Sequence, residues 1–479
     1  MPGLNLTESQ FRTARQSVQS RFIKIELLNY QFQTVDSIEG TCIDGSIDID
    51  ANSDIRRTGS VSLVINDSTF EVEPGGKIWL DKYLRVWIGN YDLLSDDIAW
   101  NNCGIFIIDA PSYQYDSSNN TLTLSMLDLM AKLTGERNGY LEGIPLKLLA
   151  GESIRDAIIS TLKLGGFTKY IVETPPAPGT IPVDLDFDQG STVYDVLKGL
   201  CDIYPDYEMF FDINGTFIYQ KIPTGENDPV LVDDTLWDSI VISENISPDF
   251  QNVKNSIEVY GRTHDPAHFS TETTVSGNTI NLTMEDVDEY TDGMIYGFTL
   301  STSSELTNMS LKINSLGVLP IKLDDGVTDV TINPEEGEIY YCVQYKGTFW
   351  NWLGHLQSYG KAEELNPKSP FYINGTVGKI RLPLYGGDYD NVFSDDLARQ
   401  RAEYELYLHS HMNDAIELTC VPVYWMDVNI LSRYTTRRNN KTDLYMIKSV
   451  SLGLSSANGM NISMIKYYPQ YPEIVTLRN

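Results

Sequence analysis

The chain has 479 residues, of which 42% are hydrophobic and 21% charged, as in a folded globular protein of roughly two to four domains. Its formal net charge of −31 argues against a protein that grips nucleic acid, because neutralising phosphates requires clustered Lys and Arg. The sequence shows neither the long apolar run of a transmembrane helix nor the apolar stretch of a secretory signal near its start.

An acidic surface also repels phosphate, so it suits a wall past which nucleic acid slides without sticking. Charge alone does not separate such a wall from an ordinary acidic protein. The five cysteines are scattered and form no CxxC pair. We therefore expect reduced, partly buried thiols rather than a disulfide framework or a zinc site.

The first 20 residues predict a helix. Thr7 to Gln10 matches a capping box, and Phe11, Ala14 and Val18 form a thin apolar stripe. The cations of this region form the most basic local patch of the chain: Arg12, Arg15, Arg21 and Lys24. The patch suits docking on an acidic neighbour, and a solvated terminal helix fits it equally well.

Residues 21–130 read as all-β, with many short alternating segments separated by turn signals, which is typical of a barrel or sandwich. Examples are the alternations at 61–65 and 122–126 and the apolar run at 104–109. A short helix is predicted over 127–133, ending at Gly135.

Residues 190–222 predict a helix followed by a β-hairpin. Val193, Val196, Leu197 and Leu200 share one helix face, and Pro205 stops the helix. The segment 212–215 ends in Asn-Gly, which supplies the positive φ that a hairpin turn needs. A similar helix start lies at residue 151, and the two helices frame a Pro-rich extended link over 173–182. We interpret the segment that starts at 151 as a second capped helix rather than as a repeat of the first.

Strands return near residue 240, and the clearest helix of the chain spans 394–409. Strands at 416–424, 443–452 and 460–467 close the chain. The predicted domains are 1–145 (helix and first β-barrel), 146–235 (α+β), 236–264 with 386–479 (second β-barrel with the long helix), and 265–385 (β-rich insertion).

Catalytic motifs are missing from the sequence: it has no GxSxG elbow, no Walker A loop and no GxGxxG after a strand. We therefore assign no catalytic, cofactor-binding or metal-binding residues, and expect a protein that is not an enzyme.

The sequence contains two weak metal patterns. A calcium loop places oxygen ligands at alternate positions, as do Asp48, Asp50, Asn52 and Asp54. However, Ser53 stands where such a loop has its Gly, and Gly59 stands where it has its closing Glu. We therefore favour a polar loop between strands. His409 and His411 lie at a helix end, where side chains two apart diverge, so exposed histidines are preferred.

Acidic pairs such as Asp324-Asp325 and Asp388/Asp390 match what a glycosidase needs, but they are expected by chance among 66 acidic residues. The aromatic run at 340–352 is compatible with a sugar-binding platform. We favour a packed hairpin core or a subunit interface for it.

Several ordered segments resemble the baseplate hub (tail-tip hub) proteins of long-tailed bacteriophages and phage-tail-like particles, a family related to the late control protein D group. The resembling segments are 53–62, 104–111 (GIFIIDAP), 121–133, 190–219, 253–261, 366–370, 398–406 and 445–454.

The resemblance implies a mainly β fold with two tail-tube-like β-barrels, a small helix–hairpin domain and a β-rich insertion. It implies a homotrimer that joins the hexameric tail tube, or a distal tail protein, to a central spike or tip protein. The ring would line the channel for DNA or for the tape-measure protein, without stable nucleic-acid binding or a membrane segment. The location implied is the virion tail baseplate, assembled in the bacterial cytoplasm.

Two alternatives stay open. One is a tail-associated cell-wall hydrolase, although we expect no lytic domain, since only residues 467–479 follow the last predicted strand. The other is a carbohydrate-binding host-recognition protein, which would use segment 265–385. The kind of tail, the presence of a genome and the host are not predicted.

Overall fold

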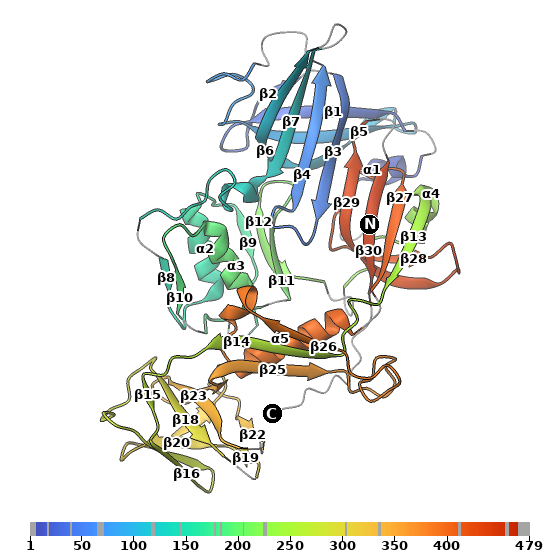
Figure 1. Ribbon diagram of the computed structural model, residues 1–479. Coiled ribbons are helices and arrows are strands. Elements are labelled where there is room, and N and C mark those ends of the chain that lie inside the picture. The colour runs from blue at the N-terminus through green and yellow to red at the C-terminus, as the bar shows by residue number, and fades with distance from the viewer. Residues whose placement is uncertain are drawn as a thin grey trace.

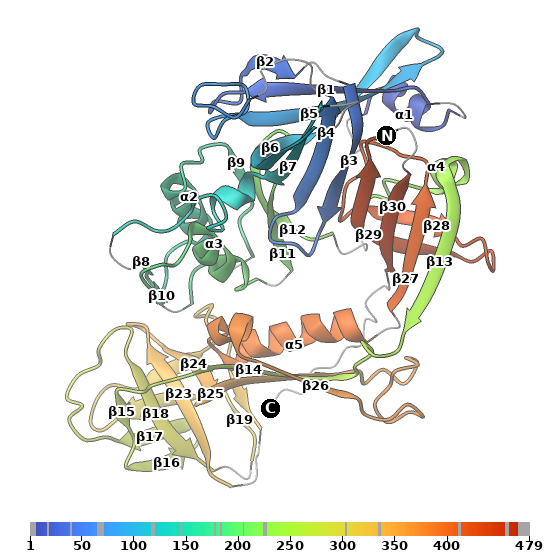
Figure 2. The same ribbon diagram turned by 45° about the horizontal axis from the view of Figure 1, so that its top comes forward.

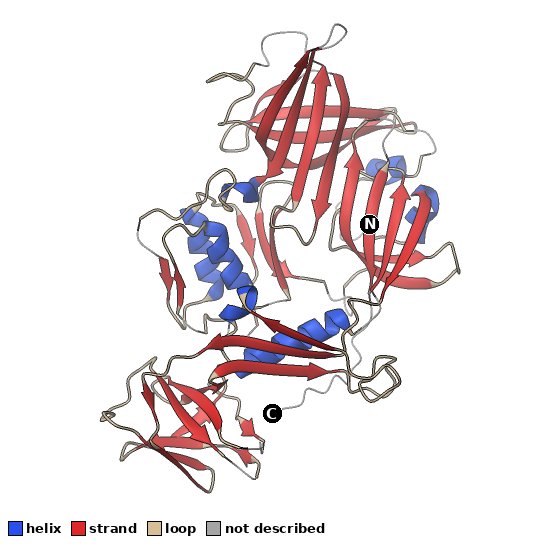
Figure 3. Ribbon diagram, viewed as in Figure 1, coloured by secondary structure: helices blue, strands red, loops and turns tan. Residues whose placement is uncertain are grey.

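The computed structural model describes residues 6–16, 19–38, 41–64, 71–115, 120–143, 146–176, 179–182, 184–204, 206–223, 228–301, 304–333, 337–410, 413–455 and 459–467. Strands dominate these residues (Figure 3), and the predicted mainly β class is confirmed. No helix in the described ranges has the length and apolar character needed to cross a membrane.

The first strand group forms the top of the molecule in Figure 1. Its elements are α1 (Glu8–Ala14), β1 (Arg21–Leu28), β2 (Thr34–Ile38), β3 (Thr41–Asp50), β4 (Arg57–Val64), β5 (Tyr83–Asp92), β6 (Asp97–Tyr115), β7 (Asn120–Asp128) and the 3-10 helix η2 (Leu129–Lys132). The predicted capping box of α1 is confirmed: Thr7 accepts from the Gln10 backbone, and the Gln10 side chain accepts from the Thr7 backbone. Val18 lies outside the described residues.

One detail of this group differs from the prediction, and a second concerns a point that the sequence left open. The helix predicted over 127–133 is only the single 3-10 turn η2, because Leu127 and Asp128 still belong to β7 and Asp128 caps the turn. The basic helix α1 docks on its own strand group, where the Arg12 guanidinium pairs with the fully buried Asp92. Hydrogen bonds from Arg12 and Ser9 hold the pKa of the Asp92 carboxyl well below its usual range.

The second strand group lies beside the first one in Figures 1 and 2. It consists of α4 (Asp234–Ile240), β13 (Val241–Asp249), β27 (Asn413–Cys420), β28 (Leu431–Thr435), β29 (Thr442–Gly453) and β30 (Met460–Lys466). Its first strand and its last four are separated by more than 160 positions of sequence, from residue 249 to residue 413.

The two strand groups form one sheet. Strand β29 pairs with β3, which gives a 12-stranded sheet in the order β13-β27-β30-β29-β3-β4-β7-β6-β5-β1-β2, with β28 paired to β29. One continuous core supports both groups: Leu27 and Leu124 of the first share it with Trp237 and Ile462 of the second. The sequence predicted two barrels and gave no sign of this junction.

The middle domain contains the predicted helix–hairpin unit. Its elements are β8 (Leu146–Leu148), α2 (Ile154–Leu164), β9 (Tyr170–Val172), β10 (Leu185–Phe187), α3 (Val193–Cys201), β11 (Tyr207–Phe211) and β12 (Phe217–Lys221). Val193, Val196, Leu197 and Leu200 are all buried, as predicted. The hairpin turns through Gly215 at a φ of 70°.

The long helix α5 (Asp395–His409) forms where it was predicted, with Ser394 as its N-cap. Its predicted place in the second barrel was wrong. It packs on a separate three-stranded sheet of β14 (Ser256–Thr263), β25 (Gln357–Glu363) and β26 (Arg381–Tyr385), next to the 3-10 helix η3 (Gly387–Asn391). Ile257, Val259 and Ala362 supply the apolar sheet face that meets Ala398 and Ala402 of α5.

The insertion has a core of its own at the lower left of Figure 1. Its strands are β15 (His268–Phe269), β16 (Glu272–Ser276), β17 (Thr279–Thr283), β18 (Ile295–Leu300), β19 (Leu306–Thr307), β20 (Ser310–Ile313), β21 (Leu319–Lys322), β22 (Thr331–Ile332), β23 (Ile339–Tyr345) and β24 (Trp350–His355). Strands β25 and β26 fall inside the segment 265–385 but pair with β14. The limits of the four predicted domains stay a proposal.

Candidate functional site

One face of the joined sheet is covered by short polar and acidic side chains. Each strand of this region alternates between an apolar and a polar residue, so that every second side chain enters the core. Ile47, Val450 and Ile462 are buried in this way, while their neighbours Asp48 and Ser451 point to the other side.

Strand register aligns the polar residues in rows, two of which cross the boundary between the two strand groups. The first row contains Ser243, Thr419, Asn461, Ser451, Asp48 and Thr58. The second contains Asn245, Glu417, Ser463, Ser449 and Asp50. Further rows contain Ser46, Ser60 and Ser125, and Asp44, Ser62, Thr123 and Ser112. We call these residues the polar face; they include four carboxylates and no Lys or Arg.

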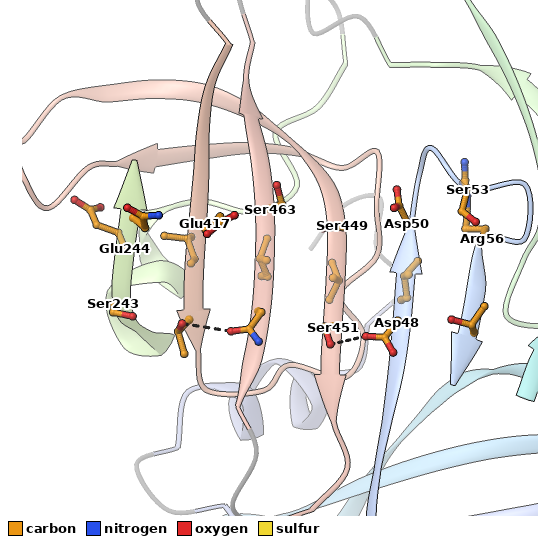
Figure 4. A pocket seen from close by; sticks show the side chains of 18 of the residues that line it. Asp48, Asp50, Ser53, Arg56, Ser243, Glu244, Glu417, Ser449, Ser451 and Ser463 are labelled. Carbon is orange, nitrogen blue, oxygen red and sulfur yellow. Dashed lines mark hydrogen bonds between the residues drawn. The ribbon is translucent and has the colours of Figure 1, made fainter. Parts of the chain in front are cut away.

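Hydrogen bonds within the polar face hold its side chains close to the sheet (Figure 4). The Ser451 hydroxyl donates to Asp48 Oδ1 at 2.5 Å, and the Thr419 hydroxyl donates to Asn461 Oδ1 at 3.3 Å. Because these side chains are short and none is cationic, the polar face has few groups to grip a passing polyanion.

The centre of the polar face is a shallow hollow of about 630 Å³. Arg56 is the cation among its lining residues, and its guanidinium is engaged by the Glu208 carboxylate of the middle domain. The hollow is therefore acidic and hydroxyl-rich, with its bordering cation already neutralised.

The middle domain covers a different part of the first strand group. There, Tyr83, Ile105 and Ile107 replace the small polar residues and join the core of the middle domain with Leu197 and Leu200. The contrast shows that the fold buries the apolar part of this sheet side and leaves the polar face open to solvent among the described residues.

The predicted calcium loop does not converge on one point. Asp48 accepts from Ser46 and Ser451, Asp50 accepts from the backbone of Asn52, and Asp54 accepts from the Tyr194 hydroxyl at 2.5 Å. No group of three or more His, Cys, Asp or Glu side chains within the described ranges is arranged to hold a metal ion.

The histidines have separate structural partners. His409 Nδ1 lies 2.9 Å from the Asn252 carbonyl, while His411 is outside the described residues. His264 and His355 flank the insertion: His264 bonds the Ser358 hydroxyl, and His355 Nδ1 lies 2.7 Å from Asp395. Burial lowers the pKa of His264 to about 4.

The predicted acidic pairs have different surroundings. Asp324 is held by Asn351 and by the Ser394 hydroxyl, and burial raises its pKa, while Asp325 caps its own turn at Val327 and Thr328. Asp390 is exposed in η3, and the side chain of Asp388 is outside the described set.

The aromatic run 340–352 forms the hairpin of β23 and β24. Trp350, Trp352 and Tyr341 are 0%, 6% and 3% exposed and belong to the core of the insertion, which confirms the packed-hairpin interpretation. Tyr340 is exposed and lies 5.7 Å from the Phe269 ring, centroid to centroid.

Four cysteines are buried free thiols, as predicted: Cys103, Cys201, Cys342 and Cys420. Burial raises the pKa of the Cys103 thiol to about 12, so it stays protonated and unreactive. The side chain of Cys42 lies outside the described set.

Comparison with known proteins identifies the fold. A family model described as a domain of unknown function (DUF5048) matches residues 368–471. No curated protein matches the chain. The 43 kDa tail protein of prophage MuSo2 from Shewanella oneidensis is 11% identical, with a TM-score of 0.50 over 93% of this chain and 98% of that one.

Two further solved structures are similar at lower scores. The tail protein from Neisseria meningitidis MC58 is 9% identical, with a TM-score of 0.49 over 93% of this chain and 96% of that one. An E. coli type VI secretion component, described as structurally similar to T4 bacteriophage tail proteins gp27 and gp5, is 7% identical, with a TM-score of 0.40 over 92% and 77%. Identities this low describe the fold alone. The assignment of a phage tail protein fold to this chain depends on the match with the Shewanella protein.

Proposed function

We propose that this chain, which has the fold of a phage tail protein over most of its length, is the structural hub of a tail baseplate. In this role three copies form a ring that joins the hexameric tail tube, or a distal tail protein, to a central spike or tip protein. The protein would reside in the tail of the virion or tail-like particle, after assembly in the bacterial cytoplasm.

The observation that carries the proposal is the joined sheet. Each chain contributes two strand groups that share one core and one continuous polar face. If each strand group is a tube-type barrel, three chains offer six similar units to a six-fold tube and keep a three-fold face for the spike.

The polar face suits the wall of the channel. Asp44, Asp48, Asp50 and Glu417 repel phosphate, and the surrounding hydroxyls offer no cationic contact. DNA or the tape-measure protein would pass along such a wall without a strong binding site.

Deletion of the gene tests the role. We expect particles that lack this protein to fail to complete the baseplate and tail, as seen by electron microscopy of the lysate. Normal tails from the deletion strain would overturn the proposal. Complementation with the wild-type chain should restore complete tails.

A second test addresses the channel wall. Ser60→Lys with Ser451→Lys places two cations on the polar face, and we expect tails to assemble while DNA delivery falls. The control Ser276→Lys adds a cation to the exposed strand β16 of the insertion and should leave delivery unchanged. Equal delivery by both variants would show that the polar face does not line the channel.

Neither alternative function gains a supporting observation. The sugar-binding interpretation needed an exposed platform, whereas the two tryptophans of the aromatic run are core residues. A cell-wall hydrolase would release soluble fragments from purified peptidoglycan, and we expect none from the full chain. Measurable release would replace the structural proposal with an enzymatic one.

A further inference from the structure

A cavity of about 350 Å³, which we call the junction pocket, lies where three parts of the molecule meet. Its walls come from the end of α5, from β29 and β30 of the second strand group, and from the hairpin of β11 and β12 in the middle domain. Figure 1 shows these three parts around the centre of the molecule. Cavities between domains, with volumes of roughly 300 to 1,000 Å³, are common sites for small ligands.

Apolar side chains supply much of the lining of the junction pocket. They come from α5 (Tyr404 and Leu408), from β29 (Met446) and from β30 (Ile465). Burial raises the pKa of the Tyr404 hydroxyl to about 12, so this side chain is neutral at ordinary pH. A ligand that fills the pocket therefore needs an apolar body.

One cation of the junction pocket has no carboxylate partner. Lys448 of β29 is partly buried, and its Nζ donates to Asn429 Oδ1 at 3.0 Å. An ammonium group has three N–H donors, and no acidic side chain of the described residues forms an ion pair with this one. Burial lowers the pKa of Lys448 from its ordinary value, as expected for an ammonium group that leaves water without a counter-ion.

The other charged groups of the lining already have partners. The ion pairs are Glu208 with Arg56, Asp206 with Lys221 at 3.1 Å, and Lys466 with Asp443 at 2.8 Å. The imidazole of His409 contacts the Asn252 carbonyl and lies 3.6 Å from Glu405. Lys448 therefore adds one positive charge that the lining does not neutralise.

We infer that the junction pocket binds a small monocarboxylate with an apolar body. The carboxylate accepts a hydrogen bond from Lys448, and such a charge-assisted bond is strong in an apolar cavity. The apolar body lies between α5 and β29. A phosphate suits the pocket poorly, because its second negative charge would be buried near Glu208 and Asp206 without a second free cation.

A ligand at this place connects the parts of the chain that form the pocket. The Lys448 carbonyl accepts from the backbone N–H of Ala51 at 2.9 Å, close to the point where β29 joins β3. The ligand thus binds where the joined sheet, the middle domain and α5 come together. Because the unfolded chain lacks this pocket, binding stabilises the folded chain. The inference does not depend on the proposed hub.

Calorimetric titration of the full purified chain tests the pocket. The probe is octanoate, its neutral counterpart is octan-1-ol, and inorganic phosphate is the third compound. We expect octanoate to bind roughly tenfold more tightly than octan-1-ol, or better, and to raise the temperature of unfolding. Inorganic phosphate should give neither effect.

Lys448→Met tests the anchoring cation, because it keeps a long apolar side chain and removes the charge. We expect its affinity for octanoate to fall to that for octan-1-ol. The matched control is Lys466→Met, which removes a lysine of the same pocket that is already paired with Asp443, and it should bind octanoate like wild type. Circular dichroism of each variant confirms folding.

Ala51→Phe narrows the pocket without changing Lys448 and should weaken the binding of octanoate and octan-1-ol alike. This variant keeps the inference testable if Lys448→Met does not fold. Absence of octanoate binding to the wild type, or equal octanoate affinity of the wild type and Lys448→Met, overturns the inference. Such a result leaves the hub intact if the deletion strain still lacks complete tails.

Discussion

Two junctions hold the parts of this molecule together by different means. Both junctions have an apolar core. Beside that core, the strand groups meet the middle domain through buried charges, whereas α5 meets its sheet and the insertion through close backbone contact. Both junctions connect segments that are far apart in sequence, so their difference shows two ways to fix one part of a chain on another.

The first junction contains one buried ion pair and the hydrogen bonds around it. Arg56 of the first strand group pairs with Glu208 of β11, and both are less than 9% exposed. The amide of Asn429, from the second strand group, also donates to Glu208. The neighbouring Arg57 donates to the Phe211 carbonyl at 2.7 Å and pairs with Asp427. Three parts of the chain thus converge on two adjacent arginines.

The second junction depends on glycines around the start of α5. A Cβ at Gly360 would lie 2.1 Å from the Ala398 backbone, and one at Gly354 would lie 1.9 Å from the Asp395 carboxylate. That carboxylate accepts from the backbone of His355 at 3.0 Å and of Tyr359 at 2.7 Å. Shape, these backbone hydrogen bonds and the contact of His355 Nδ1 with Asp395 fix the start of the helix here.

Glu208→Ala gives the largest expected effect. It leaves the buried Arg56 guanidinium without its carboxylate, which costs about 3–5 kcal/mol of unfolding free energy. The urea midpoint of the chain measures the loss. Lys147→Ala, which removes an exposed pair with Asp184, should cost less than about 1 kcal/mol. Equal losses for the two variants would refute the importance of burial at the first junction.

Gly360→Ala tests the second junction. The added methyl group forces α5 away from β25, and overpacking of this kind costs about 1–3 kcal/mol. Gly317→Ala is the control, because a Cβ there meets no atom within 4 Å. Hydrogen exchange of the α5 amides should rise in the first variant alone; unchanged exchange would mean that the contact is loose.

Asp128→Asn tests a smaller effect at the first junction, a change in the free energy of unfolding that depends on pH. Burial raises the pKa of Asp128 to about 6, from an ordinary value of 3.8, despite hydrogen bonds from the backbones of Arg57 and Met130. The folded state therefore binds this proton more tightly than the unfolded state, and the carboxylate destabilises the fold above about pH 6.

Acidification protonates Asp128 and so removes this destabilisation in the wild type. The Asp128→Asn variant has no titratable group at this position, so its stability lacks this pH dependence. Between pH values of about 6 and about 4, wild-type stability should rise relative to the variant by at most about 1.4 kcal/mol per pH unit. Paired urea titrations across this range measure the difference. A constant difference would show that Asp128 titrates normally.

Local patterns predicted the elements that carry their own signal. The helix faces of α3, the Asn-Gly turn after β11 and the capped start of α5 all formed where expected. The helix α4 and the strand β28 were not predicted, because each has only a few residues and draws its stability from long-range contacts such as Trp237 with Ser432.

The polar face shows the limit of local signals most clearly. Alternation predicted strands around residues 61 and 122, but no local pattern indicates that Ser451 will meet Asp48, 403 positions earlier. The candidate calcium loop was suggested by some of the same carboxylates, whose place on one face becomes visible only when the sheet sets them beside hydroxyls on neighbouring strands.

The sequence by itself determined most of the longer strands and helices and which side of each is apolar, because those properties depend on neighbouring residues and the periods of the backbone. Only the tertiary structure decided that β29 joins β3, that α5 leaves the second strand group for its own sheet, and that the acids of separate strands form one face. Many strands of this chain have a similar propensity to pair with one another, so their local sequence does not choose the partner. The burial of one shared core favours the pairings that the fold contains.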